Sequence, residues 1–435
     1  MFFFKKKENL FVDILNIKVD FSKIINIKEA KLVYINGKGN LTVETGTSEP
    51  PNWEAPAKIK LNGIPLIQAQ IPDCPTCSSL LATGYGIENT NCKELLEIQE
   101  KINFDYVNLE TSIDNMKALL TLLKSGFYLI ADAICYPTDG KNFFWNVPNN
   151  LTENLTTAPA YLGEGTYVFN QPVYLYPTQT TDSYNKDRVE YYVEKFKNSA
   201  DNKPRAIVYN FKDFINFIID GHHKACASAL LKEAVSCILI IPDKIYEDYY
   251  KNTRLNFSGI LIDYKNIPKE YTRYIKKERF SPSQEKIEIK DGIVNNREWE
   301  KEYINSAKYY PSIIDYANVI DIMQDKEIEV NDIFIENCLE NFDEDSQLKM
   351  KKFLYLLEFT DIKKAQEIAL KYARKTLREE EIEKELKKLV YRILLSAKNN
   401  EEVEKIFIDY IVYYSDNKED PILNIINSYW EENNG

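Results

Sequence analysis

The chain has no excess of positive charge, no long apolar run and almost no histidine, and these shortages exclude several classes of function. Its 67 acidic residues outnumber its 55 basic ones, which gives a formal net charge of -12. A protein that coats nucleic acid or docks on anionic lipid needs clustered Lys and Arg, so both roles are disfavoured. No run approaches the ~20 apolar residues that span a bilayer, and we therefore expect no membrane partner.

Cysteine is also scarce, and its number is odd. Seven cysteines spread over 435 residues fit free thiols or a metal site better than a disulfide framework. The N-terminal stretch 1–7 places its apolar residues before its charges, whereas a secretory signal begins with its basic part. We therefore expect a cytoplasmic protein.

The length allows about three domains at ~150 residues each, and the pattern along the chain changes twice. The expected fold class is an α+β multidomain protein. Residues 1–164 are predicted to form an antiparallel β-rich domain that carries a cysteine knuckle, and residues 165–290 a central α/β domain. Residues 291–435 show apolar residues at helical spacing, which predicts an all-α module, solenoid-like in character, that holds a protein partner.

Local signals place several element ends. Asn36-Gly37 and Asn62-Gly63 are typical of hairpin turns between strands in the first domain. In the central domain Asp187 suits the N-cap of a helix, with Glu190 three residues later as its capping-box partner.

The five residues Asp220-Gly221-His222-His223-Lys224 contain both histidines of the chain. An apolar strand precedes them and an Ala-rich helix follows. Backbone N–H groups at a helix start, with the positive end of the helix dipole, bind anions, and a glycine permits the close approach of a phosphate. This pattern favours a phosphate site. The alternative is a structural turn in which Asp220 caps the helix and the imidazoles bond to backbone.

The segment 170–241 has a strand and polar loop at 173–182, a helix at 187–199, a strand at 205–209, and a loop at 218–227 that runs into an Ala-rich helix. In this order of parts it resembles the ParB/sulfiredoxin superfamily. The closest pattern is Asp-Gly-Asn-His-Arg of free serine kinase-like members. Here His222 replaces the Asn and Lys224 replaces the Arg, and the absence of a Cys at position 222 argues against sulfinic acid reduction.

The resemblance implies a nucleotide ligand, which is ATP, ADP or CTP with magnesium. The predicted catalytic residues are Asp220, His222 and His223, because phosphoryl transfer needs positioned cations and a carboxylate. The predicted nucleotide-binding residues are Gly221, Lys224, Thr178, Thr180, Thr181 and Ser183.

The second candidate site is the knuckle Cys74-Pro75-Thr76-Cys77 with Cys92 and the more distant Cys135. Such thiolate spacing suits a structural zinc ion, while free thiols and a redox pair are the alternatives.

The leading hypothesis is thus a nucleotide-binding protein that acts as a phosphotransferase or NTPase. One alternative is a non-enzymatic, zinc-stabilised scaffold with a helical partner-binding module. The other is a ParB-like nuclease or DNA-associated protein, although nucleic acid is a disfavoured partner at this net charge.

Overall fold

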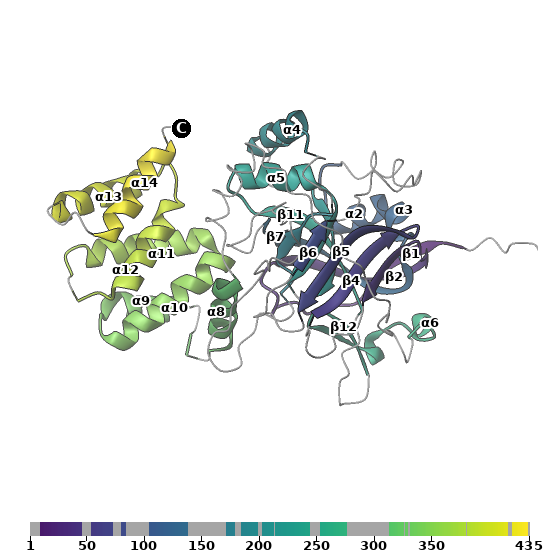
Figure 1. Ribbon diagram of the computed structural model, residues 1–435. Coiled ribbons are helices and arrows are strands. Elements are labelled where there is room, and N and C mark those ends of the chain that lie inside the picture. Colours follow the sequence, from purple (N-terminus) through teal and green to yellow (C-terminus); the bar gives the residue numbers. More distant parts are fainter. Residues whose placement is uncertain are drawn as a thin grey trace, which may run out of the picture. The chain divides into compact units, whose positions relative to one another are not determined.

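The computed structural model divides the chain into two compact units, Met1–Ile314 and Asp315–Gly435 (Figure 1). It describes residues 9–45, 54–72, 80–83, 104–137, 171–178, 184–198, 202–212, 214–243, 253–275, 313–325, 327–328, 331–379, 381–415 and 420–433.

A mixed seven-stranded sheet forms the centre of the first unit, in the order β1-β2-β7-β11-β9-β10-β8. Its strands are β1 (Phe11–Leu15), β2 (Ile27–Lys38), β7 (Lys124–Cys135), β8 (Tyr174–Tyr176), β9 (Ala206–Lys212), β10 (Ile215–Asp220) and β11 (Val235–Pro242). β2, β7 and β11 pair antiparallel, whereas β9 is parallel to β11 and β8 is parallel to β10. The inner strands are buried on both faces, which explains their nearly continuous apolar sequences.

The sheet closes on itself at one edge. Tyr136, directly after β7, forms a parallel bridge to Tyr174 in β8. The Tyr136 N–H donates to the Val173 carbonyl at 2.7 Å, and the Leu175 N–H donates to the Tyr136 carbonyl at 2.8 Å. The strands β7, β11, β9, β10 and β8 therefore form a ring. The outer side of β8 is paired instead of being left as an open edge.

A second, four-stranded sheet is antiparallel throughout. It has the order β3-β4-β5-β6, with β3 (Leu41–Thr45), β4 (Glu54–Leu61), β5 (Ile64–Pro72) and β6 (Leu80–Thr83). The turn predicted at Asn62-Gly63 is confirmed, because both residues have positive φ between β4 and β5. The turn predicted at Asn36-Gly37 is wrong. Both residues lie inside β2, where a Cβ on Gly37 would collide with the Leu123 carbonyl oxygen.

Short helices and a hairpin are also described in the first unit. These are α2 (Leu109–Asn115), α3 (Lys117–Leu120), α4 (Lys186–Lys197), α5 (His222–Leu230), the hairpin of β12 (Arg254–Phe257) with β13 (Ile260–Asp263), and α6 (Lys269–Thr272). The helices α4 and α5 pack side by side, and Val189 and Phe196 of α4 belong to the same apolar core as Ala225 of α5 (Figure 1). The N-cap of α4 is Asn185, whose side chain accepts the Arg188 N–H, and not the predicted Asp187.

The second unit is a run of helices, as predicted. They are α8 (Ile313–Gln324), α9 (Asp332–Glu340), α10 (Glu344–Thr360), α11 (Ile362–Thr376), α12 (Lys384–Leu395), α13 (Glu401–Tyr414) and α14 (Pro421–Asn433). From α9 to α13, each helix begins at an Asn, Asp or Glu whose side chain accepts a backbone N–H of the first turn. Most of these helices pack against a helix that is near them in sequence, such as α10 against α11 and α12 against α14.

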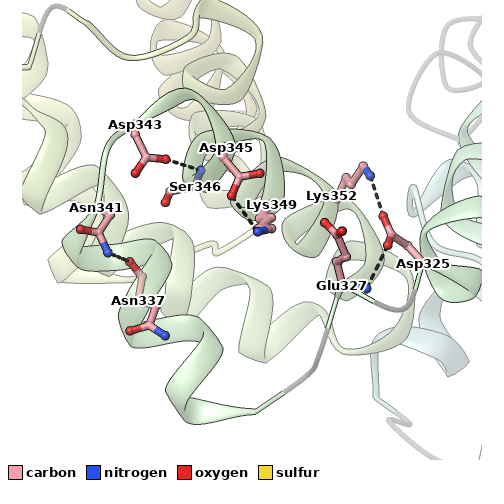
Figure 2. A network of polar contacts seen from close by, with 9 residues as sticks. All are labelled: Asp325, Glu327, Asn337, Asn341, Asp343, Asp345, Ser346, Lys349 and Lys352. Carbon is pink, nitrogen blue, oxygen red and sulfur yellow. Dashed lines mark hydrogen bonds and ion pairs between the residues drawn. The ribbon is translucent and has the colours of Figure 1, made fainter.

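Polar contacts fix the start of this stack. Asp343 caps α10, Asp345 pairs with Lys349 at 2.7 Å, and Lys352 reaches Asp325 at 2.6 Å (Figure 2). Both ion pairs are at least partly exposed, so solvent screens them and they contribute little to stability. The buried apolar faces of the helices, such as Phe353 and Leu357 of α10, therefore supply most of the stability.

The expected boundary between residues 164 and 165 falls between β7 and β8, which are strands of one ring. The expected boundary between residues 290 and 291 lies outside the described residues. Over the described ranges, every helix is too short or too polar to cross a bilayer.

Candidate functional site

Helix α5 begins directly at the carboxyl end of β10. Gly221 connects them and is the N-cap, with a left-handed φ of 109°. Within the described chain no side chain caps this helix start, and its first turn contains no acidic residue. A Cβ at position 221 would stand 2.8 Å from the Cβ of Ala206 in β9. The glycine is therefore required both by its φ and by the close approach of β9.

The two histidines of the first turn bond to backbone in different segments. The Thr178 N–H donates to Nε2 of His222 at 2.9 Å, and the Asn185 N–H donates to Nε2 of His223 at 3.1 Å. Because an accepting nitrogen carries no proton, both rings are neutral with their hydrogen on Nδ1. The hydroxyl of Thr178 also donates to the Ile218 carbonyl at 2.7 Å. The imidazoles thus hold the residues on either side of 179–183 beside the helix start.

The environment of His222 keeps it neutral. The ring is buried, and burial lowers the pKa of His222 well below its usual 6.5, with repulsion from His223 as the second cause. The bond from Thr178 is therefore retained at neutral pH, where the unprotonated ring is available as an acceptor.

This pKa shift predicts acid destabilisation. Below pH 6.5 His222 binds a proton in the unfolded chain but stays neutral in the folded chain. The contribution of His222 to the free energy of unfolding is therefore complete above pH 6.5 and falls as the pH is lowered. Between pH 7.5 and 5.5 we expect a loss of about 1.4 kcal/mol from this residue. The control is His222→Gln, which keeps an acceptor but does not titrate. Urea unfolding across this range should show wild type losing more stability than the variant, and parallel profiles would contradict the prediction.

Lys224 points inward. Its side chain is 1% exposed, and Nζ donates to the Arg205 carbonyl at 3.1 Å and to Oδ2 of Asp220 at 3.2 Å. The ring of Tyr192 lies 5.9 Å from the ammonium. The charges of Lys224 and Asp220 thus compensate each other, and the ammonium links α5 to the start of β9.

A buried ion pair supports that start of β9. The Arg205 guanidinium donates from Nε to Oδ1 of Asp132 at 3.0 Å and from Nη2 to Oδ2 at 3.2 Å. Its Nη1 donates to the Lys203 carbonyl, and its face lies 3.6 Å from the ring centre of Tyr106. This bidentate geometry fixes β9 against β7, and Lys224 is bonded to the same residue.

The structure brings the predicted site residues together in part. Asp220 to Lys224 and Thr178 lie around the start of α5. Thr180, Thr181 and Ser183 lie outside the described residues. Asn185, Arg205 and Asp132 also belong to this region and were not predicted from the sequence. Asn185 had a usable signal, since an Asn shortly before a helix is a strong N-cap residue.

The predicted zinc ligands are only partly described. Cys74, Cys77 and Cys92 lie outside the described residues. Cys135 ends β7 in the apolar core, where its Sγ lies 3.6 Å from the Pro172 carbonyl. Among the side chains that the structure describes, no three His, Cys, Asp or Glu residues gather as metal ligands do. The zinc site stays a prediction.

Comparison with known proteins gives no relative. No protein-family model, curated protein or solved structure matches this chain.

Proposed function

We propose that the start of α5 binds the phosphate of a nucleotide, which is ATP, ADP or CTP with magnesium. The observation that carries the proposal is the junction at Gly221, where α5 begins directly at the carboxyl end of β10 with a glycine in a left-handed conformation and no acidic residue in its first turn. A helix N-terminus supplies backbone N–H donors and the positive end of the helix dipole, and both favour the binding of a phosphate group. The resemblance of residues 170–241 to the ParB/sulfiredoxin superfamily supports the same ligand class.

The contacts of the side chains suggest separate roles. His222 and His223 act as positioning residues, because each already accepts a backbone N–H through Nε2. Lys224 is a support within the fold, since its ammonium bonds to Arg205 and Asp220. Asp220 is the carboxylate at the strand end, so it is the candidate to orient an acceptor hydroxyl or to hold magnesium in a phosphotransferase or NTPase.

Titration calorimetry with each nucleotide and magnesium tests this proposal. We expect wild type to bind at least one nucleotide. His223→Ala should weaken that binding about tenfold, because the bond that positions Asn185 is lost. His223→Gln keeps an acceptor at the same reach and should stay within about threefold of wild type. Thermal melting of each variant, recorded by circular dichroism, controls for unfolding.

Two results would contradict the proposal. The first is the absence of binding by all three nucleotides to wild type. The second is equal affinity of wild type and a folded His223→Ala variant for the nucleotide that binds. If a nucleotide binds to wild type, its hydrolysis or phosphate transfer is assayed next. Asp220→Asn should bind the nucleotide but lose turnover if the carboxylate acts in the reaction.

The stacked helices favour a second candidate, a non-enzymatic scaffold. Arrays of packed helices present extended surfaces to protein partners, and α9, α10, α11 and α12 contact one another in sequence order. If the protein binds no nucleotide but binds a protein partner through residues 315–435, the scaffold function is favoured over nucleotide binding.

A further inference from the structure

Two buried amide side chains hold the junction at which the ring of strands closes. Asn26, just before β2, donates through Nδ2 to the Ile134 carbonyl at 3.1 Å and to the Pro172 carbonyl at 2.8 Å. Gln171, just before β8, donates through Nε2 to the Lys23 carbonyl at 3.0 Å. Each amide thus reaches into the segment that carries the other, and the two form a reciprocal clasp.

These donations fix which way the amide of Asn26 faces. Both hydrogens of its Nδ2 are used by carbonyl oxygens, so exchanging the positions of Oδ1 and Nδ2 would break two bonds. Oδ1 must therefore act as an acceptor. Asn26 is 6% exposed and Gln171 is 4% exposed, and neither Oδ1 of Asn26 nor Oε1 of Gln171 accepts a hydrogen bond within the described chain.

Each of these two buried oxygens destabilises the fold unless a hydrogen-bond donor reaches it. A buried acceptor without a partner costs about 1–3 kcal/mol, and two of them lie in one small region. Their chemistry restricts the ligand. Both are neutral amide oxygens, and a water molecule donates two hydrogens. A monovalent cation needs more oxygens, yet the Pro172 carbonyl already lies within bonding distance of both Asn26 and Cys135.

We propose that Asn26 and Gln171 form a binding site for ordered internal water at this junction. The water completes the hydrogen bonds of the clasp and so helps to join the segment before β2 to the segment before β8. Internal waters of this kind satisfy buried polar groups that the chain itself leaves unpaired.

A crystal structure of the full chain, at a resolution that shows ordered water, tests this. We expect density within hydrogen-bond distance of Oδ1 of Asn26 and Oε1 of Gln171. The same map contains a reference, because Oε1 of the buried Gln347 accepts the Glu383 N–H at 2.7 Å and needs no water. In Gln171→Met, which removes one acceptor, the density should be lost or weakened.

A second crystal soaked in rubidium chloride separates water from a cation. Water gives no anomalous peak at the site, whereas an anomalous peak would overturn the proposal in favour of a cation. Absence of density beside both amides in wild type would also overturn it, as would unchanged density in Gln171→Met.

Discussion

Gly221→Ala is expected to destabilise the first unit by about 4 kcal/mol. Two causes act together. The φ of 109° is unfavourable for any residue with a Cβ, and that Cβ would lie 2.8 Å from the Cβ and 2.9 Å from the Cα of Ala206. Because neither β9 nor α5 can move without disturbing the sheet, the strain cannot be relieved locally. Urea unfolding followed by circular dichroism measures the change.

Gly63→Ala is the matched control. Gly63 also has a positive φ, of 80°, but within 4 Å of its Cβ position the described residues leave open space. Its replacement should cost only the conformational strain, about 1 kcal/mol. A second control combines Gly221→Ala with Ala206→Gly, which removes one of the two close contacts and should restore part of the loss. Equal effects at Gly221 and Gly63 would show that Ala206 does not confine the site.

Asp132→Ala should cost about 3–5 kcal/mol, because it leaves the Arg205 guanidinium buried without its carboxylate. Both side chains are less than a tenth exposed, and both oxygens of Asp132 accept hydrogen bonds from Arg205. The loss should also loosen the start of β9, to which Lys224 is bonded. Urea unfolding again measures the change.

An exposed ion pair supplies the comparison. Arg254 and Asp263 lie 2.8 Å apart in the β12–β13 hairpin, but their side chains are 54% and 35% exposed. Asp263→Ala should therefore cost no more than about 1 kcal/mol. The double variant Asp132→Leu with Arg205→Met should be far less damaging than Asp132→Ala alone, because it leaves no unpaired charge. A small effect of Asp132→Ala would mean that water reaches Arg205.

The elements that could be predicted are those whose signals are local. The strand, glycine and helix around position 221 follow one another in sequence, and their order alone indicates the junction. The two Asn-Gly pairs show that a local signal alone does not always predict a turn. Asn62-Gly63 forms its turn, whereas Asn36-Gly37 lies in a strand, because Gly37 is needed for its close approach to the Leu123 carbonyl. That contact joins residues far apart in the chain and has no local signature.

The membership of the central sheet could not be predicted for the same reason. β7 and β11 pair through Cys135 and Val235, with most of the central segment between them. The alternation of apolar residues indicates that each is a strand but not which strand lies beside it.

In the candidate site, too, the local features were predictable and the long-range contacts were not. The position of the histidines at a helix start was predictable from the sequence. The residues whose backbone N–H groups donate to their rings, Thr178 and Asn185, come from another part of the chain. The sequence predicts that Lys224 binds the phosphate of a nucleotide, and it gives no sign of the contacts that the ammonium makes with the Arg205 carbonyl and Asp220. Charge in a sequence does not reveal whether its counter-charge lies within the fold.

Closure of the ring imposes an order of events during synthesis. β2 and β7 leave the ribosome early, but β11, the other neighbour of β7, ends at Pro242, so the sheet cannot be completed before that residue has emerged. Until then one side of the long apolar strand β7 is without its partner β11, and exposed strands of this kind are prone to aggregate. The helices of the second unit contact near neighbours in sequence and can fold as they emerge. We therefore expect the first unit to depend on chaperones more than the second unit does.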